Sequence, residues 1–129
     1  EAGTLRREVF VDDLKWPAWL VGDDTDAEAL HAVVRNRLGQ PLATGRLLTE
    51  APGVGRIGRM AVIRVMRGTQ LGADVLKALL AAAWARGDWE VVLSAQRSAA
   101  GFYARLGFEE RGPDFDEAGI AHVEMARRR

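Results

Sequence analysis

Residues 56–72 carry the sequence RIGRMAVIRVMRGTQLG, and this stretch decides the fold. Arg56–Ile63 has the character of a strand, and glycines at 68 and 72 mark a turn that opens a long amphipathic helix. A helix N-terminus after a glycine turn presents unpaired N–H groups and the positive end of a dipole, which favours a phosphate group. The stretch therefore predicts a binding site for a phosphate-bearing ligand. A plain turn with a surface arginine, Arg67, is the alternative.

Hydrophobic periodicity predicts two helices. The first runs over Gly68–Arg86 and ends at Gly87, which is suited to a helix C-terminus. The second runs over Ala99–Leu106 and ends at Gly107. The apolar stripe of the first helix consists of Leu71, Val75, Leu76, Leu79, Leu80 and Ala83.

The remaining segments alternate between strands and turns. Strands are predicted over Ala29–Asn36, Leu42–Leu48, Arg56–Ile63, Glu90–Leu93 and His122–Ala126, with another beginning at Phe108 and Glu109. At the N-terminal end, Leu5–Asp13 is predicted as a helix and Trp16–Asp26 as an irregular loop. Together these segments predict one α/β (α+β) domain over residues 1–129, with helices flanking a sheet.

Composition narrows the classes of function. The chain has 18 Lys and Arg against 18 Asp and Glu, so no net charge favours nucleic acid as a partner. It has no cysteine, which excludes disulfides, thiolate metal sites and a cysteine nucleophile. Asp23, Asp24 and Asp26 lack the spacing of a calcium loop, so no metal is expected. No apolar run is long enough to span a membrane, and we expect a cytoplasmic protein.

Three segments carry a resemblance to a known family. They are Met60-Ala61-Val62, Arg67–Gly72 and Ala99–Phe108, the last containing Phe-Tyr and Leu-Gly-Phe. In these segments the chain resembles the GNAT superfamily of acetyl-CoA-dependent N-acetyltransferases. Phe115–Met125 is similar to the end of a small bacterial subgroup that includes glyphosate N-acetyltransferase.

The resemblance implies a mixed, mostly antiparallel sheet flanked by helices. The family normally has a strand before its first helix, so this first strand is predicted to be missing or shortened here. The family's loop pattern is Q/R-x-x-G-x-G/A, and Gln70 stands where its middle glycine is usual. The residues that the resemblance assigns to acetyl-CoA binding are Met60, Ala61, Val62, Arg67, Gly68, Thr69, Gln70, Leu71, Gly72, Ala73 and Phe102.

The resemblance also implies the chemistry. Tyr103 is the candidate general acid toward the departing thiolate, and His122 is the candidate general base, with Glu117 as the alternative base. Arg59 and Arg97 are candidates to bind an anionic acceptor, although each is equally well a surface ion pair. Glu117 joins them as an acceptor-binding candidate.

An N-acetyltransferase acting on a small amine is the leading interpretation. Because cysteine is absent, direct attack in a ternary complex is favoured over an acyl-enzyme intermediate. An acyl-CoA-binding or regulatory module with little turnover is the alternative. A nucleotide-binding domain is a weaker reading, since no Gly-x-x-x-x-Gly-Lys-Ser/Thr run is present. Homodimers are frequent in the family, so a homodimer is compatible with the resemblance.

Overall fold

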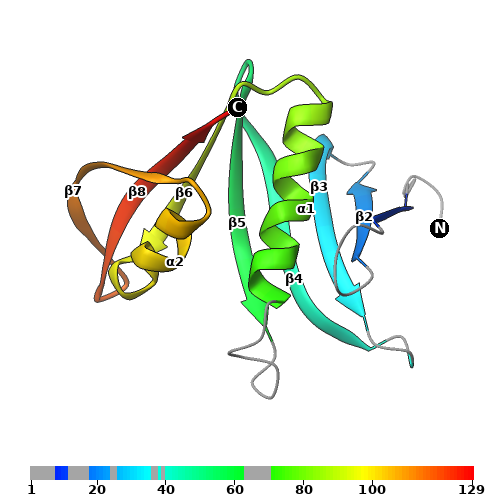
Figure 1. The fold of residues 1–129 in the computed structure, drawn as a ribbon, viewed down its shortest axis with the longest axis horizontal. Coiled ribbons are helices and arrows are strands. Elements are labelled where there is room, and N and C mark those ends of the chain that lie inside the picture. The colour runs from blue at the N-terminus through cyan, green and yellow to red at the C-terminus, as the bar shows by residue number, and fades with distance from the viewer. Residues whose placement is uncertain (1–7, 12–17, 24–25, 36–37, 39, 63–70) are drawn as a thin grey trace.

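The computed structural model describes residues 8–11, 18–23, 26–35, 38, 40–62 and 71–129 (Figure 1). The strands are β1 Glu8–Val11, β2 Ala18–Asp23, β3 Asp26–Arg35, β4 Pro41–Ala51, β5 Val54–Val62, β6 Glu90–Gln96, β7 Glu109–Glu117 and β8 Ile120–Arg128. The helices are α1 Leu71–Ala85 and the short α2 Ala100–Arg105, which follows the 3-10 turn η2 Arg97–Ala99.

The strands form a single sheet in the order β1-β2-β3-β4-β5-β6-β8-β7. Each neighbouring pair is antiparallel except β5 and β6, which run parallel on either side of α1 in the chain. A parallel pair needs a crossover connection, and the chain between β5 and β6 contains α1. The predicted mixed, mostly antiparallel sheet with flanking helices is confirmed.

The N-terminal elements differ from the prediction. Within Leu5–Asp13, predicted as a helix, the described residues form the short strand β1. Within Trp16–Asp26, predicted as an irregular loop, Ala18–Asp23 forms β2, which pairs with both β1 and β3. Both predictions were wrong for these residues. The Glu-Val-Phe-Val run is rich in β-branched and aromatic side chains, which pack well on a pleated sheet.

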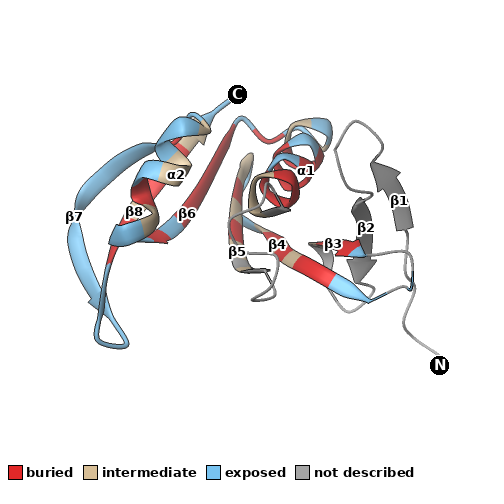
Figure 2. Cartoon of the chain, turned by 60° about the horizontal axis from the view of Figure 1, so that its bottom comes forward, coloured by how far each residue is buried: buried red, intermediate tan, exposed pale blue. Residues whose placement is uncertain are grey.

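The core lies between the sheet and the two helices. Figures 1 and 2 show α1 over β3–β5 and α2 beside β6 and β7, both on the same face of the sheet. The predicted stripe of α1 is buried at Val75, Leu76, Leu79, Leu80 and Ala83. The core continues on β6 and β8 through Val91, Leu93, Ala95, Val123 and Met125.

Glycines end both helices as predicted. Gly87 has φ +100° and Gly107 has φ +92°, a left-handed conformation that suits glycine because it has no Cβ. After α1, the N–H of Asp88 bonds back to the carbonyl of Ala83 at 2.9 Å. Among the described residues, no helix is long and apolar enough to cross a membrane.

Candidate active site

Strands β5 and β6 separate part-way along their length. They pair only at Val54–Glu90, Gly55–Val91 and Arg56–Val92, although β5 continues to Val62 and β6 to Gln96. In Figure 1 the two strands diverge below this contact. Within the described part of the chain, the edge of β5 from residue 57 to 62 therefore has no strand partner on the β6 side. Such an edge carries N–H and C=O groups that can pair with another extended chain.

A bulge lies in the unpaired half of β5. Gly58 faces Arg46 on β4 and Ala61 faces Thr44, so three steps along β5 match only two along β4. The extra residue lies at Arg59 and Met60. Bulges redirect backbone groups and are frequent beside active sites. The predicted cofactor residues Met60, Ala61 and Val62 thus lie on the open edge. Of Arg59, the structure describes the backbone only.

Only the last residues of the predicted pyrophosphate-binding turn lie within the part of the chain that the structure describes. Arg67, Gly68, Thr69 and Gln70 lie outside the described residues. Leu71, Gly72 and Ala73 form the first turn of α1, and Gly72 and Ala73 are half-buried. Since α1 is the element that follows β5, these residues come after the open strand edge in the chain.

Tyr103 lies on α2, on the helix-covered face. Its ring packs edge-on against Phe102, with centroids 5.1 Å apart, and against Phe108 at 6.0 Å. Burial raises the pKa of the Tyr103 phenol, which keeps the hydroxyl protonated. No hydrogen bond joins this hydroxyl to another described residue, and it is not among the buried polar atoms that lack a partner.

His122 lies near the start of β8 and is only 8% exposed. Its Nδ1 is 2.8 Å from the carbonyl oxygen of Ile120, and its ring stacks on Phe115 with centroids 5.8 Å apart. A carbonyl only accepts, so Nδ1 is the donor in this bond, and in the neutral form of the ring the lone pair is at Nε2. The neighbouring Val123 points into the core, so His122 faces the other side of the sheet.

The two remaining predicted acceptor residues have different surroundings. Arg97 donates to Glu110 at 2.8 Å and also pairs with Asp114, and this pairing raises the pKa of the guanidinium further. Its charge is already balanced by two carboxylates. Glu117, at the end of β7, is exposed and has no ion pair with any other described residue.

The comparisons with known proteins identify the family. The model of the acetyltransferase (GNAT) domain family matches residues 22–129. The chain belongs to the GNAT acetyltransferase family. An uncharacterised N-acetyltransferase of Bacillus subtilis, YjcF, is 32% identical over 128 residues, which is 98% of this chain and 90% of the relative.

Solved GNAT-like structures agree with the fold. An acyl-CoA N-acyltransferase from Pseudomonas aeruginosa is 34% identical with a TM-score of 0.68, over 82% of this chain and 69% of that one. ElaA from Escherichia coli is 28% identical with a TM-score of 0.73, over 82% of this chain and 72% of that one. The family supports acyl transfer, with an acyl-CoA as the donor, as the activity of this GNAT chain.

One feature of this GNAT chain beside the candidate site was not predicted from the sequence. Arg56, the last residue of β5 that pairs with β6, donates to Glu50 on β4 at 2.7 Å and to Glu124 on β8 at 2.5 Å. Ser94 on β6 donates to Glu124 at 3.2 Å. These contacts tie four strands together where β5 and β6 part, and they raise the pKa of Arg56, chiefly through Glu50. In the sequence, Arg56 followed by alternating apolar residues predicts a strand, but it does not predict the ion pairs of Arg56.

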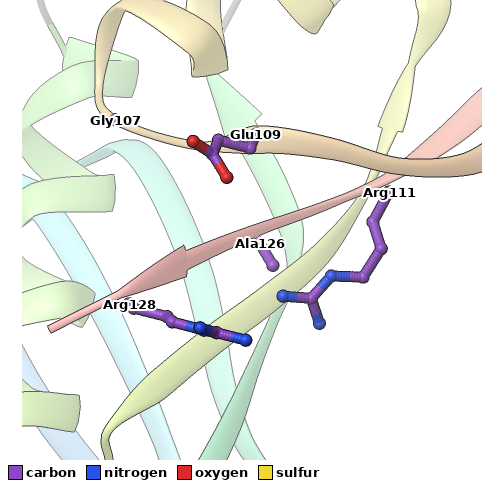
Figure 3. A pocket seen from close by; sticks show the side chains of 5 residues that line it. All are labelled: Gly107, Glu109, Arg111, Ala126 and Arg128. Carbon is purple, nitrogen blue, oxygen red and sulfur yellow. The ribbon is translucent and has the colours of Figure 1, made fainter.

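A separate groove of about 390 Å³ lies at the other end of the β7–β8 pair. Figure 3 shows its lining, which consists of Gly107, Glu109, Arg111, Ala126 and Arg128. Arg111 donates to the buried Glu90 at 2.6 Å and lowers the pKa of that carboxyl, and Arg128 approaches it at 3.5 Å. The arginines here balance a buried charge. Among the described residues, no cluster of His, Asp or Glu suits a metal ion.

Proposed function

We propose that this chain transfers the acetyl group of acetyl-CoA to the amine of a small molecule, by direct attack in a ternary complex. The observation that carries the proposal is the parting of β5 and β6 after Arg56, followed by the bulge between Gly58 and Ala61. An open strand edge and a redirected N–H together suit an extended amide-containing arm that ends in a thioester.

The donor's extended arm would pair with the free edge of Met60, Ala61 and Val62, as an added strand does. An N–H of the bulge is the natural partner for the thioester carbonyl oxygen as negative charge develops there. Leu71, Gly72 and Ala73 begin a 15-residue helix, whose N-terminal N–H groups suit the pyrophosphate. The assignment of Arg67, Gly68, Thr69 and Gln70 to the same group stays a prediction.

The residues available for proton transfer complete the reaction. The lone pair of Nε2 on His122 takes a proton from the acceptor ammonium, and the freed amine nitrogen attacks the thioester carbon. As the tetrahedral intermediate collapses, the attacking nitrogen loses its second proton to solvent, the C–S bond breaks and the amide forms. The thiolate takes a proton from the Tyr103 hydroxyl, which water then restores. The products are the N-acetylated amine and free CoA thiol.

The two residues approach the reaction from opposite faces. Tyr103 packs on the helix-covered face, and His122 lies on the reverse face at the position opposite Gln96, the last residue of β6. A thioester between the diverged ends of β5 and β6 is open to both faces, because no described strand closes the space between them. This arrangement supports Tyr103 as the acid, on the helix-covered face with the acetyl-CoA thiol, and His122 as the base, on the reverse face with the acceptor amine.

Two-substrate kinetics test the proposal. CoA thiol release is followed while acetyl-CoA and a primary amine are both varied, and the acetylated amine is identified by mass spectrometry. A ternary complex gives intersecting double-reciprocal lines with one acetylated amine per thiol, whereas an acyl-enzyme gives parallel lines. Acetyl-CoA binding without thiol release across a broad amine panel would instead favour the binding-module alternative.

A further inference from the structure

Four side chains share the reverse face of the sheet at the end of the β7–β8 hairpin. Phe115 lies directly opposite His122, and Glu117 lies directly opposite Ile120. Residues that face each other across an antiparallel pair, and residues two apart on one strand, point to the same side. The hairpin patch consists of Phe115, Glu117, Ile120 and His122. It combines a base, a carboxylate and two apolar side chains.

The two polar ends of the hairpin patch keep hydrogen-bonding capacity that no described residue uses. The Nε2 atom of His122 makes no hydrogen bond to a described residue, since only Nδ1 is engaged, by the carbonyl of Ile120. Glu117 is exposed and has no ionic partner in the described part of the chain. Diagonal positions on a two-stranded face lie about 7–8 Å apart, which is the reach of a linear spacer of about four methylene groups.

The middle of the hairpin patch is apolar and unusually open. Phe115 is 39% exposed and Ile120 is 47% exposed, among the few large hydrophobic side chains that the core leaves uncovered. Methylene groups laid across them would remove this surface from water, which is favourable. The patch therefore suits a molecule with an apolar middle between two polar ends.

The charges around the hairpin patch favour a cation at its far end. Glu124, two residues beyond His122 on the same face, is balanced by Arg56, which also pairs with Glu50. Arg97, predicted to bind an anionic acceptor or to form a surface ion pair, pairs with Glu110 and Asp114. Glu117 is the carboxylate of this group that no described cation balances.

We propose that the acceptor is a linear diamine, with one amine at Nε2 of His122, its methylene chain on Phe115 and Ile120, and a second ammonium at Glu117. This inference rests on the proposed acetyl transfer and names its substrate class. Glu117 is thereby a specificity residue for the far end of the acceptor, and His122 remains the base.

Three probes of equal length test the inference: butane-1,4-diamine, butan-1-amine and 4-aminobutanoate. They end in an ammonium, a methyl group and a carboxylate, and the measured quantity is kcat/KM for thiol release. We expect kcat/KM for the diamine to be about fivefold higher than for butan-1-amine, because one solvent-exposed ion pair contributes up to about 1 kcal/mol. We expect 4-aminobutanoate to have the lowest kcat/KM of the three. Glu117→Gln brings the first ratio, diamine over butan-1-amine, close to one.

Asp116→Asn is the matched control. Asp116 is the neighbouring exposed carboxylate but lies opposite Ala121, on the other face of the hairpin, so the diamine preference should persist. A preference for 4-aminobutanoate, or a diamine preference that survives Glu117→Gln, overturns the inference while acetyl transfer stands. Absence of thiol release with every amine overturns the proposed function, and the inference with it.

Discussion

Gly45→Ala tests how closely α1 approaches the sheet. A Cβ built at Gly45 would lie 2.7 Å from Met60 Sδ, 2.8 Å from Val75 Cγ1 and 2.9 Å from Leu79 Cδ1. All three contacts are closer than Cβ atoms normally tolerate, and two of them are with buried side chains of α1. The alanine must therefore push the helix away from β4 or force side chains out of their preferred rotamers.

The expected cost follows from these contacts. Overpacking a core by one methyl group costs about 1–3 kcal/mol, and replacing glycine returns about 0.4–1 kcal/mol by restricting the unfolded chain. The net loss of unfolding free energy is about 1–2 kcal/mol. For a chain of this size that corresponds to a fall in Tm of roughly 3–10 °C.

The assay is thermal or urea unfolding followed by circular dichroism. Gly58→Ala is the control, because Gly58 lies on the adjacent strand and its added Cβ would have no heavy atom within 4 Å. We expect Gly58→Ala to keep or slightly raise the Tm. Equal Tm values for the two variants, or a more stable Gly45→Ala, would refute the close packing of α1 on β4.

Three further predictions concern the reaction. Tyr103→Phe should lower kcat at least tenfold with little change in the KM of acetyl-CoA. In the parent, burial raises the pKa of this phenol, so kcat should not fall until the pH exceeds its ordinary value of about 10. His122→Gln should abolish the acidic limb of the kcat/KM profile, where protonation of the base stops the reaction; an unchanged limb would exclude His122. Arg56→Met should raise the KM of acetyl-CoA about threefold, because it loosens the point where β5 and β6 part, whereas Arg111→Met should leave that KM unaltered.

Much of the fold was predictable because it depends on local patterns. The stripe containing Val75 and Leu79 repeats over four turns, and Gly87 and Gly107 end their helices by a conformation that glycine favours. The N-terminal strands were not predictable in this way. In β1 the apolar residues are too few to distinguish a helical from an extended period, and β2 owes its form to pairing with β1 and β3.

The residues of the candidate site come from the family resemblance and stay predictions, and their arrangement could not be read from the sequence. Tyr103 and His122 were identified from the family resemblance, whereas their placement on opposite faces depends on the alternation of β8 and on where α2 packs. The stacking of Phe115 on His122 depends on a register shift between Arg111 and Phe115. No local sequence pattern predicts this shift. Long-range ion pairs, such as Arg56 with Glu124, 68 residues apart, are equally invisible in a sequence.

Amide hydrogen exchange in the presence of acetyl-CoA tests the central claim most directly. The claim is that the donor occupies the free edge of β5 beyond Arg56. Exchange should slow at amides within residues 57–62 on binding, while Val54–Arg56, already paired with β6, should change little. Saturable binding of acetyl-CoA with no added protection in residues 57–62 would contradict the account.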